Sequence, residues 1–358
     1  MNKTIPPAFR LFRSDDRKAA PRTKSGPADE KQPRRRKWAG VFAIVVALAM
    51  WGGMAQAQQP KVYRIGVLVP GEVWYEIVDG LRVGLRELRL EEGKQFVLSI
   101  RDWKGNAKMA DEAAKKFEQE KVDLIYATST NSTVAARRAT AEIPIVFCAG
   151  TDPVVIGLVD SFAHPGGRLT GVYNRSTDLT AKRLELLKEI LPKLRRVVTF
   201  YDPRRPTTIE SSKLAREAAQ QMGIQFVERH VGSVEEFQAG VRALRAGEFD
   251  AYLAVAEPIV TNQSQLMIDT ARAKRLPTMF NFTSEVIKGG LVSYGVSFHQ
   301  VGRVSAKYVQ RILNGVKPKD LPVEAVDKID LVINLKMAKQ IGLTVPPNVL
   351  VRADKVIK

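Results

Sequence analysis

The alternation of strand-like and helix-like segments from residue 61 onward constrains the fold of this chain more than any other sequence feature. Short runs rich in Val, Ile and aromatic residues alternate with stretches whose apolar residues recur at helical spacing. Strands that alternate with helices predict a parallel β-sheet covered by helices on both faces. The first series has predicted strands at 61–69, 96–103, 122–128 and 143–149, and predicted helices at 73–88, 107–119 and 132–142.

The pattern then restarts and predicts a second unit of similar size. Two successive arrays indicate two α/β units, each with its own sheet, and 358 residues suit about two domains. Ligands bind beyond the carboxyl ends of parallel strands, so we expect the site in a cleft between the units. The second series has predicted strands at 195–201, 224–231, 249–256, 276–282, 289–295 and 328–334, and predicted helices at 180–191, 208–223, 233–247, 262–275, 298–314 and 335–341.

The first 57 residues predict an export signal. Residues 1–37 are polar and basic, and an uncharged apolar core follows at 38–51. This core is shorter than the roughly 20 residues that a membrane helix needs. Ala55-Gln56-Ala57 matches the small-x-small cleavage pattern, so we expect cleavage after Ala57 and a periplasmic mature protein. An uncleaved N-terminal anchor is the alternative, and Arg34-Arg35 leaves a twin-arginine signal open.

The formal net charge of +18 does not predict nucleic-acid binding, because it is unevenly placed. The first 57 residues hold 12 of the 56 Lys and Arg residues but only four of the 38 Asp and Glu residues. The remaining basic residues are spread over predicted helix surfaces, without the basic stripe and interleaved aromatic residues of a nucleic-acid binder. Cys148 is the one cysteine and the three histidines lie in separate elements, so we predict no disulfide, no metal site and no cofactor.

Candidate ligand-binding residues follow the predicted strands. Thr128 to Asn131 precede a predicted helix, where hydroxyls and backbone N–H groups bind anions, and plain N-capping is the alternative. Asp152 is placed to accept a hydrogen bond from an ammonium or hydroxyl group, unless it serves a turn. We predict these ligand-binding residues: Glu72, Trp74, Tyr75, Thr128, Ser129, Thr130, Asn131, Gly150, Thr151, Asp152, Tyr201, Asp202, Glu257, Asn281, Phe282 and Tyr294.

Known catalytic signatures are missing from the sequence. It contains no G-x-S-x-G, no P-loop, no H-E-x-x-H and no G-x-G-x-x-G. We expect Cys148 to be a small core residue, since no histidine is paired with it by any visible pattern. The sequence therefore favours binding over catalysis, and we predict no catalytic residues.

Three long segments, at 143–172, 289–324 and 328–354, closely resemble the ABC-transporter substrate-binding proteins of the tryptophan/tyrosine or unknown-solute type. The resemblance extends over nearly all of 61–356. It implies an α/β type I periplasmic-binding fold, with two doubly wound parallel-sheet lobes joined by three crossover strands. Lobe 1 would comprise 58–172 plus about 297–328, and lobe 2 would comprise 173–296 plus about 329–358. Gly171 would lie in the first crossover and absorb hinge torsion.

The resemblance also implies a function. We expect an exported, monomeric solute-binding protein that captures a small polar solute between its lobes and delivers it to the ABC permease in the inner membrane. An aromatic amino acid is the first candidate, and a nucleoside, a sugar or an aromatic acid remains open. Closure of the lobes around the solute is the expected motion. The alternative function is a ligand-sensing partner of a membrane signalling receptor.

Overall fold

The computed structural model describes residues 61–358. The predicted signal peptide at 1–57 and its cleavage after Ala57 lie outside the described residues. Between residues 61 and 358, no helix is both long and apolar enough to span a membrane.

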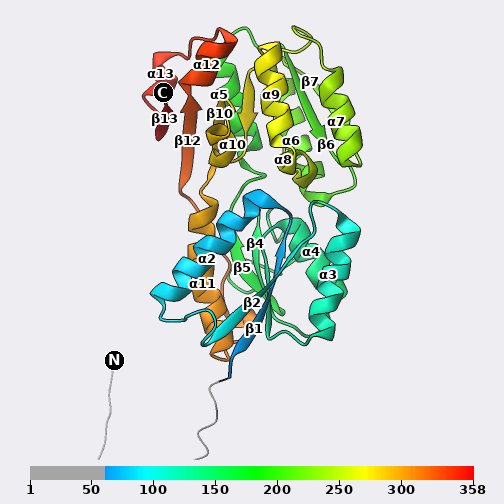
Figure 1. Ribbon diagram of the computed structural model, residues 1–358, viewed down its shortest axis with the longest axis vertical. Coiled ribbons are helices and arrows are strands. Elements are labelled where there is room, and N and C mark those ends of the chain that lie inside the picture. Colours follow the sequence, from blue (N-terminus) through cyan, green and yellow to red (C-terminus); the bar gives the residue numbers. More distant parts are fainter. Residues whose placement is uncertain (1–60) are drawn as a thin grey trace, which may run out of the picture. The chain divides into compact units, whose positions relative to one another are not determined.

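The first sheet has six strands in the order β11-β5-β4-β3-β1-β2, and each neighbouring pair is parallel. We call this sheet sheet A, and the sheet together with its helices lobe 1 (Figure 1). Val67 and Val146 belong to a core shared with α2 and α11, whereas Leu68 and Phe147 belong to a core with α3 and α4. Helices therefore cover both faces, as the sequence predicts. The elements are β1 (Tyr63–Val69), η1 (Glu72–Trp74), α2 (Tyr75–Glu87), β2 (Phe96–Asp102), α3 (Ala107–Gln119), β3 (Leu124–Ala127), α4 (Thr130–Ala139), β4 (Ile145–Ala149), β5 (Leu169–Tyr173), α11 (Phe298–Leu313), η2 (Pro318–Asp320) and β11 (Glu324–Ala325).

The second sheet has seven strands in the order β13-β12-β10-β9-β8-β6-β7, and it forms lobe 2 with the remaining helices. One pair, β10 with β12, is antiparallel and so departs from the parallel sheet predicted from sequence. The reason is that β10 leads the chain out of lobe 2, whereas β12 leads it back in. The elements are α5 (Leu179–Ile190), β6 (Arg196–Tyr201), α6 (Pro206–Gln221), β7 (Gln225–His230), α7 (Val234–Ala243), β8 (Ala251–Leu253), α8 (Pro258–Asn262), α9 (Ser264–Lys274), β9 (Thr278–Phe280), α10 (Thr283–Ile287), β10 (Val292–Val296), β12 (Ile329–Asn334), α12 (Leu335–Ile341), α13 (Pro347–Leu350) and β13 (Lys355–Ile357).

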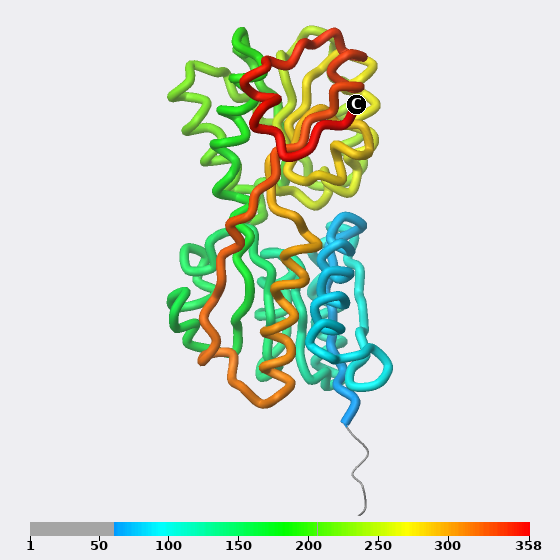
Figure 2. Tube along the Cα trace, turned by 90° about the vertical axis from the view of Figure 1, so that its left-hand side faces the viewer, coloured from blue at the N-terminus to red at the C-terminus, as the bar shows by residue number. Residues whose placement is uncertain are grey.

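The chain passes between the lobes after β5, after β10 and after β11 (Figure 2). The fold is thus the two-lobed one expected from the resemblance. Gly171 does not lie between the lobes. It lies inside β5 opposite Phe147, and a Cβ there would be 2.1 Å from the Phe147 carbonyl oxygen. With a φ of 153°, this glycine permits close strand pairing in sheet A rather than hinge motion.

Helices α2 and α11 pack with their backbones in contact. A Cβ at Gly80 would lie 1.9 Å from the His299 carbonyl oxygen, and a Cβ at Gly302 would lie 1.9 Å from the Ile77 carbonyl oxygen. Only glycine fits at either place, because no side chain could occupy the space that the facing backbone fills. This contact joins the first helix of lobe 1 to the helix that returns from lobe 2.

Candidate functional site

A cavity lies between the carboxyl ends of the two sheets. Its lining comes from both lobes, as expected for a cleft formed by two open α/β sheets. Most of the lining side chains are hydroxyls, amides and aromatic rings, with a single carboxylate among them. The lining residues are Trp74, Thr128, Ser129, Thr130, Asn131, Cys148, Gly150, Asn174, Ser176, Thr207, Ala256, Glu257, Pro258, Thr261, Phe282 and Phe298.

The N-terminus of α4 forms one end of the cavity. The Ser129 hydroxyl caps the helix by accepting a hydrogen bond from the Ser132 N–H at 3.0 Å. The N–H groups of Thr130 and Asn131 precede the first intrahelical hydrogen bond, so the helix itself gives them no acceptor. The Thr130 hydroxyl accepts from the Gly150 N–H at 2.9 Å and so fixes the loop after β4 against this helix end. The arrangement suits an anionic group, because the helix dipole and free N–H groups both favour negative charge.

Ser176 adds a buried hydroxyl to the same end of the cavity. It lies in the segment between β5 and α5, is 6% exposed, and its Oγ has no hydrogen-bond partner among the described residues. A Cβ built on Gly150 would lie 3.3 Å from the Ser176 Cβ, so the serine is next to the loop held by Thr130. A buried hydroxyl without a partner is costly unless a ligand or water satisfies it.

Three aromatic rings form the apolar wall. Trp74 comes from η1, Phe282 precedes α10 and Phe298 begins α11. The ring centroids of Phe282 and Phe298 are 4.3 Å apart, and those of Trp74 and Phe282 are 6.1 Å apart at 67°. These distances and tilts are typical of favourable aromatic packing, and a planar ring of a ligand would find suitable partners here.

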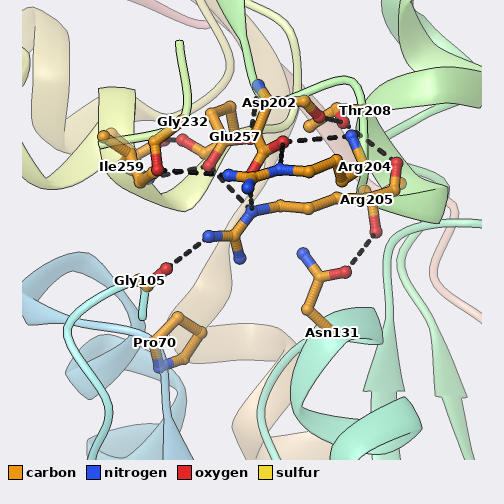
Figure 3. A network of polar contacts seen from close by, with 12 residues as sticks. Pro70, Gly105, Asn131, Asp202, Arg204, Arg205, Thr208, Gly232, Glu257 and Ile259 are labelled. Atoms are coloured by element: carbon orange, nitrogen blue, oxygen red, sulfur yellow. Dashed lines mark hydrogen bonds and ion pairs between the residues drawn. The ribbon is translucent and has the colours of Figure 1, made fainter. Parts of the chain in front are cut away.

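Glu257 is the one carboxylate that residues 61–358 contribute to the lining, and both of its oxygens have partners (Figure 3). Its Oε1 accepts from the Ile259 N–H at 2.9 Å, and its Oε2 accepts from the Asp202 N–H at 3.1 Å. The Arg205 Nε lies 3.5 Å from Oε1. Burial raises the pKa of Glu257, and the Arg205 charge opposes that rise. Glu257 thus caps α8 and stabilises the Arg205 side chain.

Arg205 itself reaches from lobe 2 to lobe 1. Its Nη2 donates to the Gly105 carbonyl oxygen (Figure 3). Its guanidinium carbon lies 5.6 Å from the centroid of the Trp103 ring. A second contact joins the lobes nearby, where the Thr207 hydroxyl donates to the Asn131 Oδ1 at 3.4 Å. These contacts close one side of the cavity.

The other side is closed by α8 and α10 of lobe 2 against the loop after β1. The Asn262 Nδ2 donates to the Pro70 carbonyl oxygen at 2.8 Å, and a Cβ on Gly71 would lie 2.0 Å from the Asn262 Oδ1. Lys288 and Glu72 form an exposed ion pair at 3.2 Å. With contacts on both sides, the two lobes are closed over the cavity.

Arg183 connects two of the segments that join the lobes. It is fully buried on α5, where its Nε donates to the Tyr294 carbonyl oxygen and its Nη1 donates to the Ser176 carbonyl oxygen, both at 2.7 Å. The first bond holds β10 and the second holds the segment after β5. Arg183 therefore links β10 to the segment that carries Ser176.

The structure brings half of the sequence-predicted site residues together around the cavity. They come from the loop after β1, the start of α4, the loop after β4 and the ends of β8 and β9. These residues are Trp74, Thr128, Ser129, Thr130, Asn131, Gly150, Glu257 and Phe282.

The other predicted residues do not line the cavity. Glu72 is exposed and pairs with Lys288, and Tyr75 begins α2. The Thr151 hydroxyl bonds that of Thr177 at 3.1 Å. The Asp152 Oδ1 accepts from the Val154 and Val155 N–H groups, which is the turn role left open above.

The remaining four predicted residues belong to lobe 2 and also lie outside the lining. The Tyr201 hydroxyl donates to Glu228 at 2.6 Å, and Asp202 binds the Arg204 guanidinium at 2.7 and 2.8 Å. Tyr294 offers its carbonyl oxygen to Arg183. Asn281 is buried, and both polar atoms of its side chain lack a partner among the described residues.

Sequence reasoning missed several lining residues. Asn174 and Ser176 follow β5, so the rule applied to the other strands would have found them. Phe298 begins a helix after a crossover, and no strand-end rule points to it. Cys148 was assigned to the core, and it is fully buried, with its Sγ 3.1 Å from the Tyr126 hydroxyl and 3.3 Å from the Ser305 hydroxyl. Burial raises the pKa of the Cys148 thiol to about 11.

Comparison with known proteins agrees with this architecture. The family model of ABC transporter substrate binding proteins matches residues 63–357. A tyrosine-binding protein of Clostridioides difficile is 26% identical over 265 residues, which cover 74% of this chain and 76% of that protein.

Two solved structures are similar over 83% of this chain and 100% of their own. One is a conserved domain protein of Vibrio cholerae, with 31% identity and a TM-score of 0.78. The other is an ABC domain of Streptococcus pneumoniae in complex with L-Trp, with 24% identity and a TM-score of 0.75.

Proposed function

The chain belongs to the family of ABC transporter substrate-binding proteins, and on this premise we propose that it captures an aromatic solute with an acid group between its lobes. An aromatic L-amino acid is the first candidate. The protein would carry out no chemistry on the solute and would deliver it to an ABC permease. The observation that carries the proposal is the cavity that joins a free helix N-terminus to a wall of three aromatic rings.

The acid group would lie at the N-terminus of α4. There it would accept from the Thr130 and Asn131 N–H groups and from the Ser176 hydroxyl, which has no partner among residues 61–358. The ring would lie against Trp74, Phe282 and Phe298. The relatives from Clostridioides difficile and Streptococcus pneumoniae, whose names include tyrosine and L-Trp, support this class of solute.

Export is part of the proposal. The basic segment at 1–37, the apolar segment at 38–51 and Ala55-Gln56-Ala57 support a signal peptide cleaved after Ala57. The mature protein would then work as a monomer in the periplasm, beside a permease in the inner membrane. N-terminal sequencing of the protein recovered from the periplasmic fraction would test the cleavage, and a mature chain that begins elsewhere would contradict it.

The solute is tested on residues 58–358, unfolded and refolded to remove any bound ligand. We expect L-Trp, L-Tyr or L-Phe to raise the melting temperature by several degrees, because a ligand that binds only the folded state stabilises it. Glucose, myo-inositol and uridine are the comparison panel. A response to a sugar or nucleoside alone would contradict the aromatic solute. If no compound raises the melting temperature of well-folded protein, the alternative role, as a partner of a signalling receptor, would be favoured.

A pair of variants locates the site. Trp74→Leu should weaken binding of the responding aromatic solute about tenfold or more, since it removes a ring from the cavity wall. Phe226→Leu is the matched control, because Phe226 lies on β7 and does not line the cavity. Isothermal titration calorimetry gives both affinities. Equal loss in the two variants would show that the solute binds elsewhere.

A further inference from the structure

The charges around the cavity narrow the class of solute. An amino acid carries an ammonium group next to its carboxylate, and a buried ammonium is costly unless it has a counter-charge or hydrogen-bond acceptors. Neutral hydroxyl and amide acceptors would leave the ammonium charge unbalanced, so the question is whether a carboxylate of this cavity is free to balance it.

Glu257 is the only carboxylate in the lining formed by the described residues, and it is already occupied. Backbone N–H groups donate to both of its oxygens, and Arg205 balances its charge from 3.5 Å.

Three carboxylates near strand ends lie outside the lining and have hydrogen-bond partners of their own. The Asp152 Oδ1 accepts from two N–H groups of its own turn. Asp202 accepts two hydrogen bonds from the Arg204 guanidinium, and Arg205 lies 3.4 Å from its Oδ2. Glu285 accepts from the Phe282 N–H, and burial raises its pKa to about 8.

For the acid group of the solute, in contrast, the cavity does offer hydrogen-bond donors. The free N–H groups of Thr130 and Asn131 point out of the start of a ten-residue helix. Ser176 supplies an independent sign of a ligand at this end, because its hydroxyl is buried in the lining with no partner among residues 61–358. The cavity thus provides for a ring and a carboxylate and leaves no free counter-charge for an ammonium.

We propose that the solute of this protein is an aromatic carboxylic acid without an α-ammonium group, such as a 3-arylpropionate. This inference rests on the proposed function, an aromatic solute with an acid group in the same cavity, and replaces its first candidate, the amino acid, by the acid without the ammonium group. The ring would occupy the aromatic wall and the carboxylate the α4 end, with the carbon chain between them carrying no charge.

Matched pairs of compounds test the inference on residues 58–358. They are L-Trp with indole-3-propionate, L-Tyr with 3-(4-hydroxyphenyl)propionate, and L-Phe with 3-phenylpropionate. Calorimetry at pH 7 should give the propionate a dissociation constant about tenfold lower than its amino acid, which is the effect of one buried polar group without a partner.

The outcomes separate the inference from the proposed function. If the amino acids bind more tightly than their propionates, the ammonium is recognised and the inference is wrong, while the aromatic solute stands. If no member of any pair binds to folded protein, both are wrong.

Glu257→Gln provides a second measurement. Because Glu257 serves α8 and Arg205, we expect the substitution to change both affinities of a pair by the same factor, so that their ratio is unchanged. A selective loss of amino-acid affinity would show that Glu257 binds the ammonium. The comparison of compounds on the unaltered protein decides the matter even if this variant fails to fold.

Discussion

At the scale of single residues, Glu285 makes stability depend on pH. Burial raises its pKa from 4.5 to about 8, against the opposing effects of backbone N–H groups and Arg183. The folded protein therefore keeps a proton that the unfolded chain loses. For this group, the free energy of unfolding falls as pH rises from about 4.5 to about 8 and is level above that range.

Replacing this carboxyl by an amide should remove the effect. Glu285→Gln keeps the shape and the acceptor for the Phe282 N–H, so we expect it to be more stable than the unaltered protein at pH 9, by on the order of 5 kcal/mol. At pH 4 the variant and the unaltered protein should have nearly equal free energies of unfolding. Urea unfolding at pH 4, 7 and 9 measures this, with the exposed Glu217→Gln as control. An unchanged difference across the three pH values would refute it.

The site residues show what single-residue reasoning from sequence can and cannot reach. Thr130 and Gly150 could be placed at the cavity because the carboxyl ends of parallel strands meet at one edge. Tyr201 and Asp152 follow strands in the same way, yet their polar atoms are taken by Glu228 and by a local turn. Such competition between partners depends on side-chain geometry, which strand order alone does not determine.

At the scale of elements, the long periodic segments were predictable, whereas several short elements, such as α8 and β13, were not. Helix α8 spans five residues and β13 spans three, too few for a hydrophobic period to show. Glu257-Pro258 did carry a signal for α8, since proline favours the first helical position and the preceding carboxylate caps it. The antiparallel β10–β12 pair follows from the path of the chain between lobes, which periodicity does not reveal.

Where α2 contacts α11, helix propensity and packing favour different residues at position 80. Propensity favours alanine, whereas the close contact with α11 requires glycine. Gly80→Ala should improve intrinsic helix propensity by about 1 kcal/mol. We nevertheless expect the variant to be less stable by about 1–3 kcal/mol, because the added methyl would meet the His299 carbonyl oxygen and separate the helices.

Thermal and urea unfolding measure the outcome. Gly167→Ala is the control, since a Cβ there meets nothing within 4 Å and its φ is not positive. An increase in stability for Gly80→Ala would mean that the two helices can move apart at no cost.

At the scale of the whole molecule, the described residues form a closed arrangement held by few contacts between lobes. The Asn262–Pro70 hydrogen bond is one of them, and a typical hydrogen bond contributes about 1 kcal/mol. Asn262→Ala should therefore shift the population toward an open form and weaken solute binding about fivefold.

Small-angle X-ray scattering tests this shift. We expect a larger radius of gyration for Asn262→Ala than for the unaltered protein at subsaturating solute, and equal values at saturation. Gln265→Ala, on α9 and bonded only to Asp269 of its own helix, is the control. Identical scattering and affinity in both variants would show that this contact does not influence closure.

The three passages of the chain between lobes also determine when the protein can fold as it is made. Strand β11, the edge of sheet A, pairs with β5 across some 150 residues of chain, and α11, which covers that sheet, is also made late. Neither lobe has its full complement of elements until nearly all of the polypeptide has been synthesised. Long-range pairing of this kind slows folding. For the export proposed above, this topology would lengthen the time during which the chain stays unfolded and can cross a membrane.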